Sequence, residues 1–191
     1  MNTFESIEKR RSIRKFKPIP VSPTLLKELV RLGRLYSSAM NGQPIRFAIV
    51  SKEDDRNFLF ENLNWAMRLH PYAIAPDERP MAYILLLGKE NETDFFEFDA
   101  GSCAATVMLA AESQNLASCC LKITKRAEIQ KKFQFGEYLP YYALALGYAG
   151  VGSRAVDSKG EIGYYLDENG DFCVPKRSLA EVLIYNDTNQ E

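Results

Sequence analysis

The 191-residue chain has few of the side chains on which metal centres and hydrolytic sites depend. His70 is the single histidine, which excludes a multi-histidine metal centre. No Gly-x-Ser-x-Gly motif is present, so the sequence offers no nucleophile elbow. We therefore expect no metal, and we expect a bound cofactor to perform any difficult chemistry.

Cysteine is also scarce, with four residues and no Cys-x-x-Cys spacing. A disulfide between the adjacent Cys119 and Cys120 would be strained. The pattern favours buried thiols over a disulfide framework or a zinc site.

Long hydrophobic runs are absent, because no apolar stretch approaches the roughly 20 residues that cross a bilayer. Residues 1–9 are polar and charged, unlike a signal sequence. Hydrophobic residues make up 46% of the chain and charged residues 26%, which is an ordinary globular balance. We expect one domain over residues 1–191, a cytoplasmic location and no membrane partner.

Positive charge is concentrated at one place in a chain whose net charge is −1. Residues 9–17 read Lys-Arg-Arg-Ser-Ile-Arg-Lys-Phe-Lys, and they contain six cations and a serine. Arginine forks bind phosphate oxygens in pairs, and a serine hydroxyl adds a donor. The segment is either a solvated charge run or an anion site formed by Arg10, Arg11, Ser12 and Arg14.

Two nucleotide-related alternatives are disfavoured. The basic segment resembles a nucleic-acid arm, but the net charge is slightly negative and the basic residues at 122–132 look like helix surface. Residues 150–155 match the Gly-x-Gly-x-x-Ala of a dinucleotide-binding turn, yet a loop and a hairpin follow where that turn needs a helix. We expect no nucleic-acid partner.

Hydrophobic spacing predicts alternating helices and strands in a layered arrangement. Helices are expected over 2–9, 22–36, 54–69, 99–115 and 124–133, and strands over 45–50, 81–87, 117–123 and 141–149. Residues 162–174 suggest a hairpin with a type I′ turn at Asn169-Gly170, and Ser178 with Glu181 would cap a last helix. The polar segment 150–170 is either an arm that reaches a neighbouring subunit or a surface excursion.

Four stretches in this order resemble the FMN-dependent nitroreductase family. They are Arg-Arg-Ser-x-Arg at 10–14, Ser-Ala-x-Asn-x-Gln-Pro at 38–44, the small-residue helix at 99–111, and Pro-Lys-Arg-Ser-Leu-Ala-Glu at 175–181. The resemblance covers nearly the whole chain. It implies an α+β fold, a three-layer α/β/α sandwich with a mixed central sheet, and a homodimer with an exchanged C-terminal arm.

The same resemblance implies the site residues. Arg10, Arg11 and Ser12 would bind the FMN phosphate together with Lys176 or Arg177, and Arg14 would lie near the flavin N1–O2 edge. Ser38, Ala39, Asn41 and Gln43 would reach the FMN that the other subunit binds, while Ala117 and Ser118 would lie along the flavin. Many relatives have glycines at 117 and 118, so we expect a shifted pocket here.

By resemblance, NADH or NADPH would reduce FMN and leave before a nitroaromatic or quinone acceptor takes the electrons. No side chain need act as acid or base. Trp65 and His70 are candidates for the substrate pocket, within a lid over 65–80, although an aromatic residue on a helix is often core. Two alternatives stay open: another FMN reaction on this fold, such as dehalogenation or dehydrogenation, and a non-enzymatic phosphate-binding or nucleic-acid-binding protein.

Overall fold

The computed structural model describes residues 2–188. Its α-helices are α1 (Thr3–Lys9), α2 (Pro23–Gly33), α3 (Glu53–Glu61), α4 (Phe96–Ser113), α5 (Arg126–Phe133) and α6 (Leu179–Val182). Its strands are β1 (Phe16–Lys17), β2 (Arg46–Val50), β3 (Ala82–Gly88), β4 (Ala117–Lys122), β5 (Leu139–Ala149), β6 (Ser153–Asp157), β7 (Tyr165–Leu166) and β8 (Phe172–Lys176). Short 3₁₀ helices lie at Ala39–Asn41, Met67–Leu69 and Pro76–Glu78.

The central sheet is built around β3 and β5, which pair antiparallel. β2 pairs with β3, while β4 and β1 pair with β5, and these ladders are antiparallel too. The parallel pairing in this sheet is the isolated bridge between Ser12 and Ser118. The mixed character of the sheet therefore arises where the basic segment meets β4.

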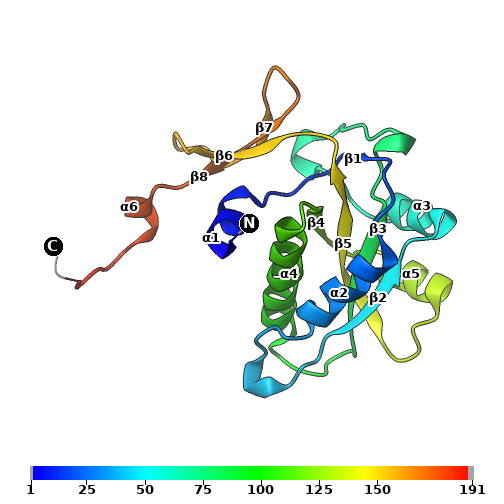
Figure 1. Cartoon of the computed structure of the whole chain (residues 1–191). Coiled ribbons are helices and arrows are strands. Elements are labelled where there is room, and N and C mark those ends of the chain that lie inside the picture. The colour runs from blue at the N-terminus through cyan, green and yellow to red at the C-terminus, as the bar shows by residue number, and fades with distance from the viewer. Residues whose placement is uncertain (1, 189–191) are drawn as a thin grey trace.

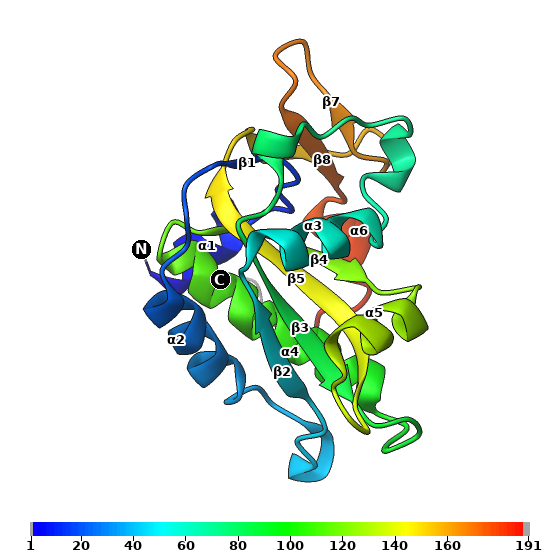
Figure 2. The same ribbon diagram turned by 90° about the vertical axis from the view of Figure 1, so that its right-hand side faces the viewer.

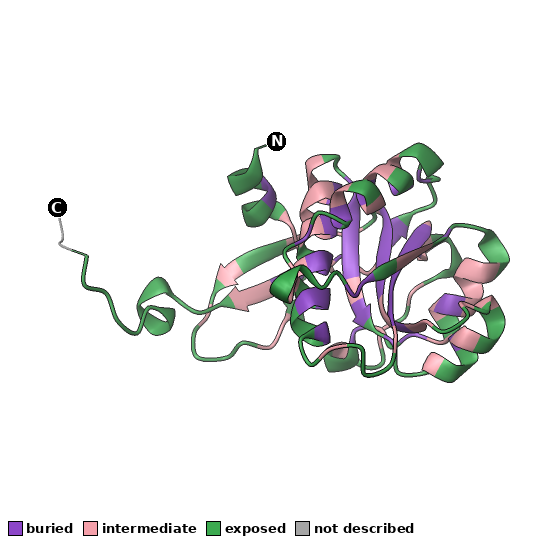
Figure 3. Cartoon of the chain, turned by 90° about the horizontal axis from the view of Figure 1, so that it is seen from below, coloured by how far each residue is buried: buried purple, intermediate pink, exposed green. Residues whose placement is uncertain are grey.

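Strand β3 is buried along its whole length, as its continuous apolar sequence predicts. Ile84 and Leu86 pack in one cluster with α2 and α4, whereas Tyr83 and Leu85 pack in another with α3 and α5. The alternation follows from the period of two along a strand. Figures 1 and 3 show the buried sheet between helices on both faces. The expected α/β/α sandwich is confirmed.

A second sheet, in the order β6-β8-β7, projects from this body (Figure 1). After it, the chain runs through α6 and extends away from the sandwich (Figures 1 and 3). Its apolar side chains lie in solvent, with Ile184 90% exposed and Tyr185 79% exposed. Among residues 2–188, no helix combines the length and apolar character needed to span a membrane.

Three predicted helices differ from the structure by three residues or more at one end. The helix expected over 54–69 ends at Glu61, because the Asn62 side chain donates to the Phe58 carbonyl and Ala66 has a left-handed backbone. The helix expected to reach Tyr36 ends at Gly33. Helix α4 begins at Phe96, so Asp99 lies in its first turn and does not cap it.

The C-terminal hairpin also differs from the prediction. Gly170 has φ +79°, but Asn169 does not take a positive φ, so the turn is not type I′. Instead, the Asp167 carboxylate accepts the backbone N–H groups of Asn169 and Asp171. Strand β6, which the sequence did not predict, follows the Gly150–Gly152 turn where a dinucleotide site would need a helix, and it pairs parallel with β8.

Candidate functional site

The basic segment is held against the start of β4. Arg10 is the C-cap of α1, and the Ile13 N–H donates to the Ser118 carbonyl at 3.0 Å. Ile13 and Phe16, which alternate with the cations of the basic segment, are buried against the sheet. Their burial holds the segment in place. The fold therefore brings Ser12 and Ile13 next to Ser118.

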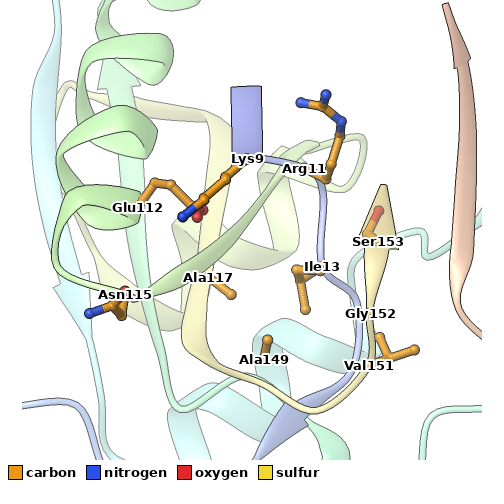
Figure 4. Close-up of a pocket in the computed structure, with 10 residues that line it drawn as sticks. All are labelled: Lys9, Arg11, Ile13, Glu112, Asn115, Ala117, Ala149, Val151, Gly152 and Ser153. Carbon is orange, nitrogen blue, oxygen red and sulfur yellow. The ribbon is translucent and has the colours of Figure 1, made fainter. Parts of the chain in front are cut away.

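A cleft of about 250 Å³ opens beside this junction. Arg11 and Ala117 line it, together with Glu112 and Asn115 at the end of α4 and Ser153 at the start of β6 (Figure 4). The last three were missed by sequence reasoning, because no motif marks them and only the fold brings them together.

Two cleft-lining residues, and Ser118 at the nearby bridge with Ser12, have polar atoms without a hydrogen-bond partner among residues 2–188. Arg11 Nε, Ser118 Oγ and Ser153 Oγ are buried without a hydrogen bond within the described part of the chain. Buried polar groups are nearly always paired, so each such atom needs an explanation. Guanidinium and hydroxyl donors match the oxygens of a phosphate ester and of a flavin ring. These side chains fit FMN.

Glu112 is the acid in this cationic cleft. Figure 4 shows its side chain and that of Lys9 pointing toward one another. Burial raises the pKa of the Glu112 carboxyl, although the charges of Arg10, Lys9 and Arg11 oppose that shift. The pKa of Arg11 is lowered, first by burial and then by repulsion from Arg10. Both shifts reflect charges that are partly withdrawn from water.

Arg14 does not line the cleft. Its guanidinium carbon lies 4.7 Å from the ring centre of Tyr164 and 5.1 Å from that of Phe172, both in the C-terminal segment. Its Nη1 donates to the Ser12 carbonyl, and its Nε is buried without a partner among the described residues. Arg11 and Arg14 belong to the same five-residue motif but have different surroundings. Arg11 lines the cleft, whereas Arg14 packs against two aromatic rings.

The loop over 38–43 is pinned by a buried acid. Asp99, which is 1% exposed, accepts the Ala39 N–H at 2.9 Å. Gln43 Nε2 donates to Asn41 Oδ1, and Met40, Asn41 and Gln43 all have left-handed backbones. Such conformations cost about 1–3 kcal/mol each and cluster at functional sites.

One chain does not bring all the predicted residues together. Figures 1 and 2 place the 3₁₀ helix at Ala39–Asn41 at the far end of the sandwich from the basic segment. The loop over 38–43 therefore lies far from the basic segment. Lys176 and Arg177 are exposed at the end of β8 on the projecting sheet.

Trp65 and His70 lie in different surroundings. The Trp65 indole stacks on Phe60 with ring centres 5.2 Å apart, and its N–H donates to the Phe60 carbonyl. His70 is exposed. Farther along the expected lid, Tyr72 packs edge-on against Phe172. The aromatic contact of the lid with the projecting sheet is thus made by Tyr72.

Comparison with known proteins gives one family match. The model of the nitroreductase family matches residues 7–148. The curated protein "Putative NADH dehydrogenase/NAD(P)H nitroreductase" of Methanothermobacter thermautotrophicus is 26% identical over 155 residues, which cover 78% of each chain.

Solved structures show the same fold. A structure from Desulfovibrio desulfuricans, described as a "putative nitroreductase in complex with FMN", has a TM-score of 0.72 and 20% identity, and the match covers 99% of both chains. The FMN-dependent nitroreductase of Clostridium difficile R20291 has a TM-score of 0.69 and 18% identity, covering 83% of this chain and 94% of the other.

Proposed function

This chain belongs to the nitroreductase family and is an oxidoreductase, and from this we propose its reaction. It passes electrons from NADH or NADPH, through bound FMN, to electron-poor acceptors such as nitroaromatics or quinones. The observation that carries the proposal is the junction of the basic segment with β4. There the buried donors Arg11 Nε and Ser118 Oγ lack partners among the described residues, next to the cations that a phosphate requires.

FMN supplies a group that accepts a hydride from one substrate and donates electrons to the next. Arg10, Arg11 and Ser12 would bind the phosphate, and Lys176 or Arg177 would complete this clamp. Arg14 would supply a positive charge near the flavin N1–O2 edge, as the resemblance implies, and preorganised charge of this kind favours the reduced state. Because both substrates use one site in turn, ping-pong kinetics are expected.

The proposed site needs two copies of the chain. The loop over 38–43 presents amide side chains at the far end of the sandwich from Arg10, so a loop of one subunit serves the phosphate segment of the other. The exposed apolar residues of the C-terminal arm, such as Ile184 and Tyr185, would be covered by the partner. We propose a homodimer with exchanged arms.

Arg10→Ala tests the phosphate contact. Removal of a charged hydrogen-bond partner is expected to weaken FMN binding by about 2 kcal/mol. Arg31→Ala is the matched control, because Arg31 forms an exposed pair with Glu28 on α2. FMN titration by fluorescence quenching gives the comparison, and equal affinities for the two variants would remove Arg10 from the site.

Subunit mixing tests the shared site. Asn41→Ala should impair FMN binding through the loop, and Arg10→Ala through the phosphate segment. If the two groups come from different subunits, a heterodimer of these variants has one intact site and one doubly impaired site. Co-refolded mixtures should therefore recover FMN that neither variant retains alone. No recovery in an isolated heterodimer would place both residues at a site within one chain.

A substrate panel distinguishes the candidate FMN reactions. An anaerobic panel of nitroaromatics, quinones, halogenated rings and saturated rings, each supplied to the NAD(P)H-reduced or oxidised protein, separates reduction from dehalogenation and dehydrogenation. Turnover of nitroaromatics or quinones with NAD(P)H supports the proposal.

A further inference from the structure

Arg14 packs against aromatic rings of the C-terminal segment. Two aromatic rings of the C-terminal segment lie against its guanidinium, at 4.7 Å for Tyr164 and 5.1 Å for Phe172. Cations are attracted to the negative face of such rings. The Ser12 carbonyl accepts from Nη1 and limits rotation further.

These two rings are themselves fixed by their neighbours. Phe172 is fully buried at the start of β8, and its ring contacts those of Tyr164 and Tyr72. The Tyr164 hydroxyl accepts the backbone N–H of Arg68 at 3.4 Å. The projecting sheet and the segment over 65–80 thus form one aromatic cluster around Arg14.

The lid segment is tied to the basic segment a second time. Lys15 forms an ion pair with Glu78 at 2.9 Å, and its ammonium lies 5.6 Å from the ring centre of Tyr72. The segment over 65–80 therefore contacts both Tyr164, through Arg68, and Lys15, through Glu78 and Tyr72. The Arg14 Nε is buried and has no hydrogen-bond partner among the described residues.

We infer that Tyr164 and Phe172 are positioning residues, which fix the orientation of the Arg14 guanidinium and so set the place of its positive charge relative to the cofactor. This inference rests on the proposed function, because FMN supplies the negative charge that Arg14 meets. A preorganised cation stabilises that charge without reorganisation, whereas a mobile arginine would turn toward water.

The inference can be tested with three variants of Tyr164 and a remote control. Tyr164→Leu removes the ring, and Tyr164→Phe keeps it while losing the hydroxyl. Tyr138→Leu is the control, because Tyr138 makes similar cation–ring contacts with Arg46 and Lys89 elsewhere on the sandwich. Tyr164→Leu combined with Arg14→Ala shows whether the effect passes through Arg14.

The first readout is the midpoint potential of bound FMN, measured with reference dyes. Tyr164→Leu should weaken the binding of reduced FMN relative to oxidised FMN about tenfold. This change lowers the midpoint potential by about 30 mV for a two-electron couple. Tyr164→Phe should keep the wild-type potential, as should Tyr138→Leu. In the Arg14→Ala background, Tyr164→Leu should cause no additional change.

The second readout needs no cofactor. In protein labelled with ¹⁵N-arginine, the ring currents should shift the Arg14 Nε–H resonance, which Arg14→Lys identifies. Tyr164→Leu should return this resonance toward the free-arginine position, and Tyr164→Phe should not. If the wild-type protein does not bind FMN, the proposed function fails, and the inferred control of Arg14 by the rings is still judged by this spectrum.

Two results would overturn the inference. One is an unshifted Arg14 resonance in the wild-type protein. The other is a change in midpoint potential on Tyr164→Leu that is equally large in the wild-type and in the Arg14→Ala background. Phe172→Leu, which keeps an apolar side chain in the core, provides a second ring removal if Tyr164→Leu does not fold, and it should reproduce the same pattern.

Discussion

The pKa of Glu112 reflects the partly buried surroundings of the cleft. Its carboxyl lies among Lys9, Arg10 and Arg11, yet burial raises its pKa above the ordinary value of 4.5. The folded protein therefore holds this proton to higher pH than the unfolded chain does. By linkage, this group lowers the free energy of unfolding as the pH rises from near 4.5 through the folded-state pKa.

Glu112→Gln should remove that pH dependence. Relative to this variant, the wild-type protein should lose stability as the pH rises through the window above 4.5, and the difference should then level off. Urea unfolding of both proteins at a series of pH values measures it. A difference that is constant, or that favours the wild type more at higher pH, would contradict the assignment.

Asp99 links the core of α4 to the loop over 38–43. Asp99→Ala leaves the Ala39 N–H without its acceptor, so we expect a loss of about 2 kcal/mol in stability and weaker FMN binding through the loop. Asp54→Ala on α3 is the control, since Asp54 is exposed. Urea denaturation and FMN titration measure the two effects, and equal behaviour of both variants would show that the loop does not depend on Asp99.

At the scale of elements, local signals predicted most helices and strands. The capping box of Asn2 and Glu5 and the fully apolar β3 appear as expected. Features that the hydrophobic pattern does not carry account for the differences. Helix α3 stops at Glu61, where the Asn62 side chain caps it locally, and β6 pairs with β8, a strand that is distant in the sequence. A two-residue strand such as β7 carries too little pattern to be predicted.

The contact between α2 and α4 depends on Gly33. A Cβ there would lie 2.6 Å from Val107 Cγ2, so Gly33→Ala should destabilise the protein by about 1–3 kcal/mol. Gly101→Ala, in the interior of α4, meets no atom within 4 Å and should stabilise the helix by up to about 1 kcal/mol. Thermal and urea unfolding compare the two, and a tolerated Gly33→Ala would contradict this packing.

At the scale of the whole molecule, one chain holds only part of the candidate site. The sequence motifs named the members, but they could not show that residues 10–14 and 38–43 lie at opposite ends of the sandwich. Glu112, Asn115 and Ser153 were beyond prediction, because they meet only when α4, β4 and β6 are assembled. The division of the site between distant surfaces is what the proposed dimer explains.

Removal of the arm tests that explanation. A chain that ends at Arg177 lacks the exposed apolar residues from Leu179 to Tyr185 but keeps both sheets. We expect it to stay folded and to change from dimer to monomer, with loss of FMN. Light scattering gives the mass and circular dichroism checks the fold. A truncated chain that remains dimeric with full FMN content would show that the arm is not the exchanged element.

The most direct test of the central claim is the visible absorption spectrum of the freshly purified protein, recorded with its mass in solution before and after anaerobic addition of NADH or NADPH. We predict a dimer with FMN in equimolar amount to the chain and bleaching of the flavin band by the reduced nicotinamide. A colourless monomer that takes up no FMN when it is supplied in excess would contradict the account.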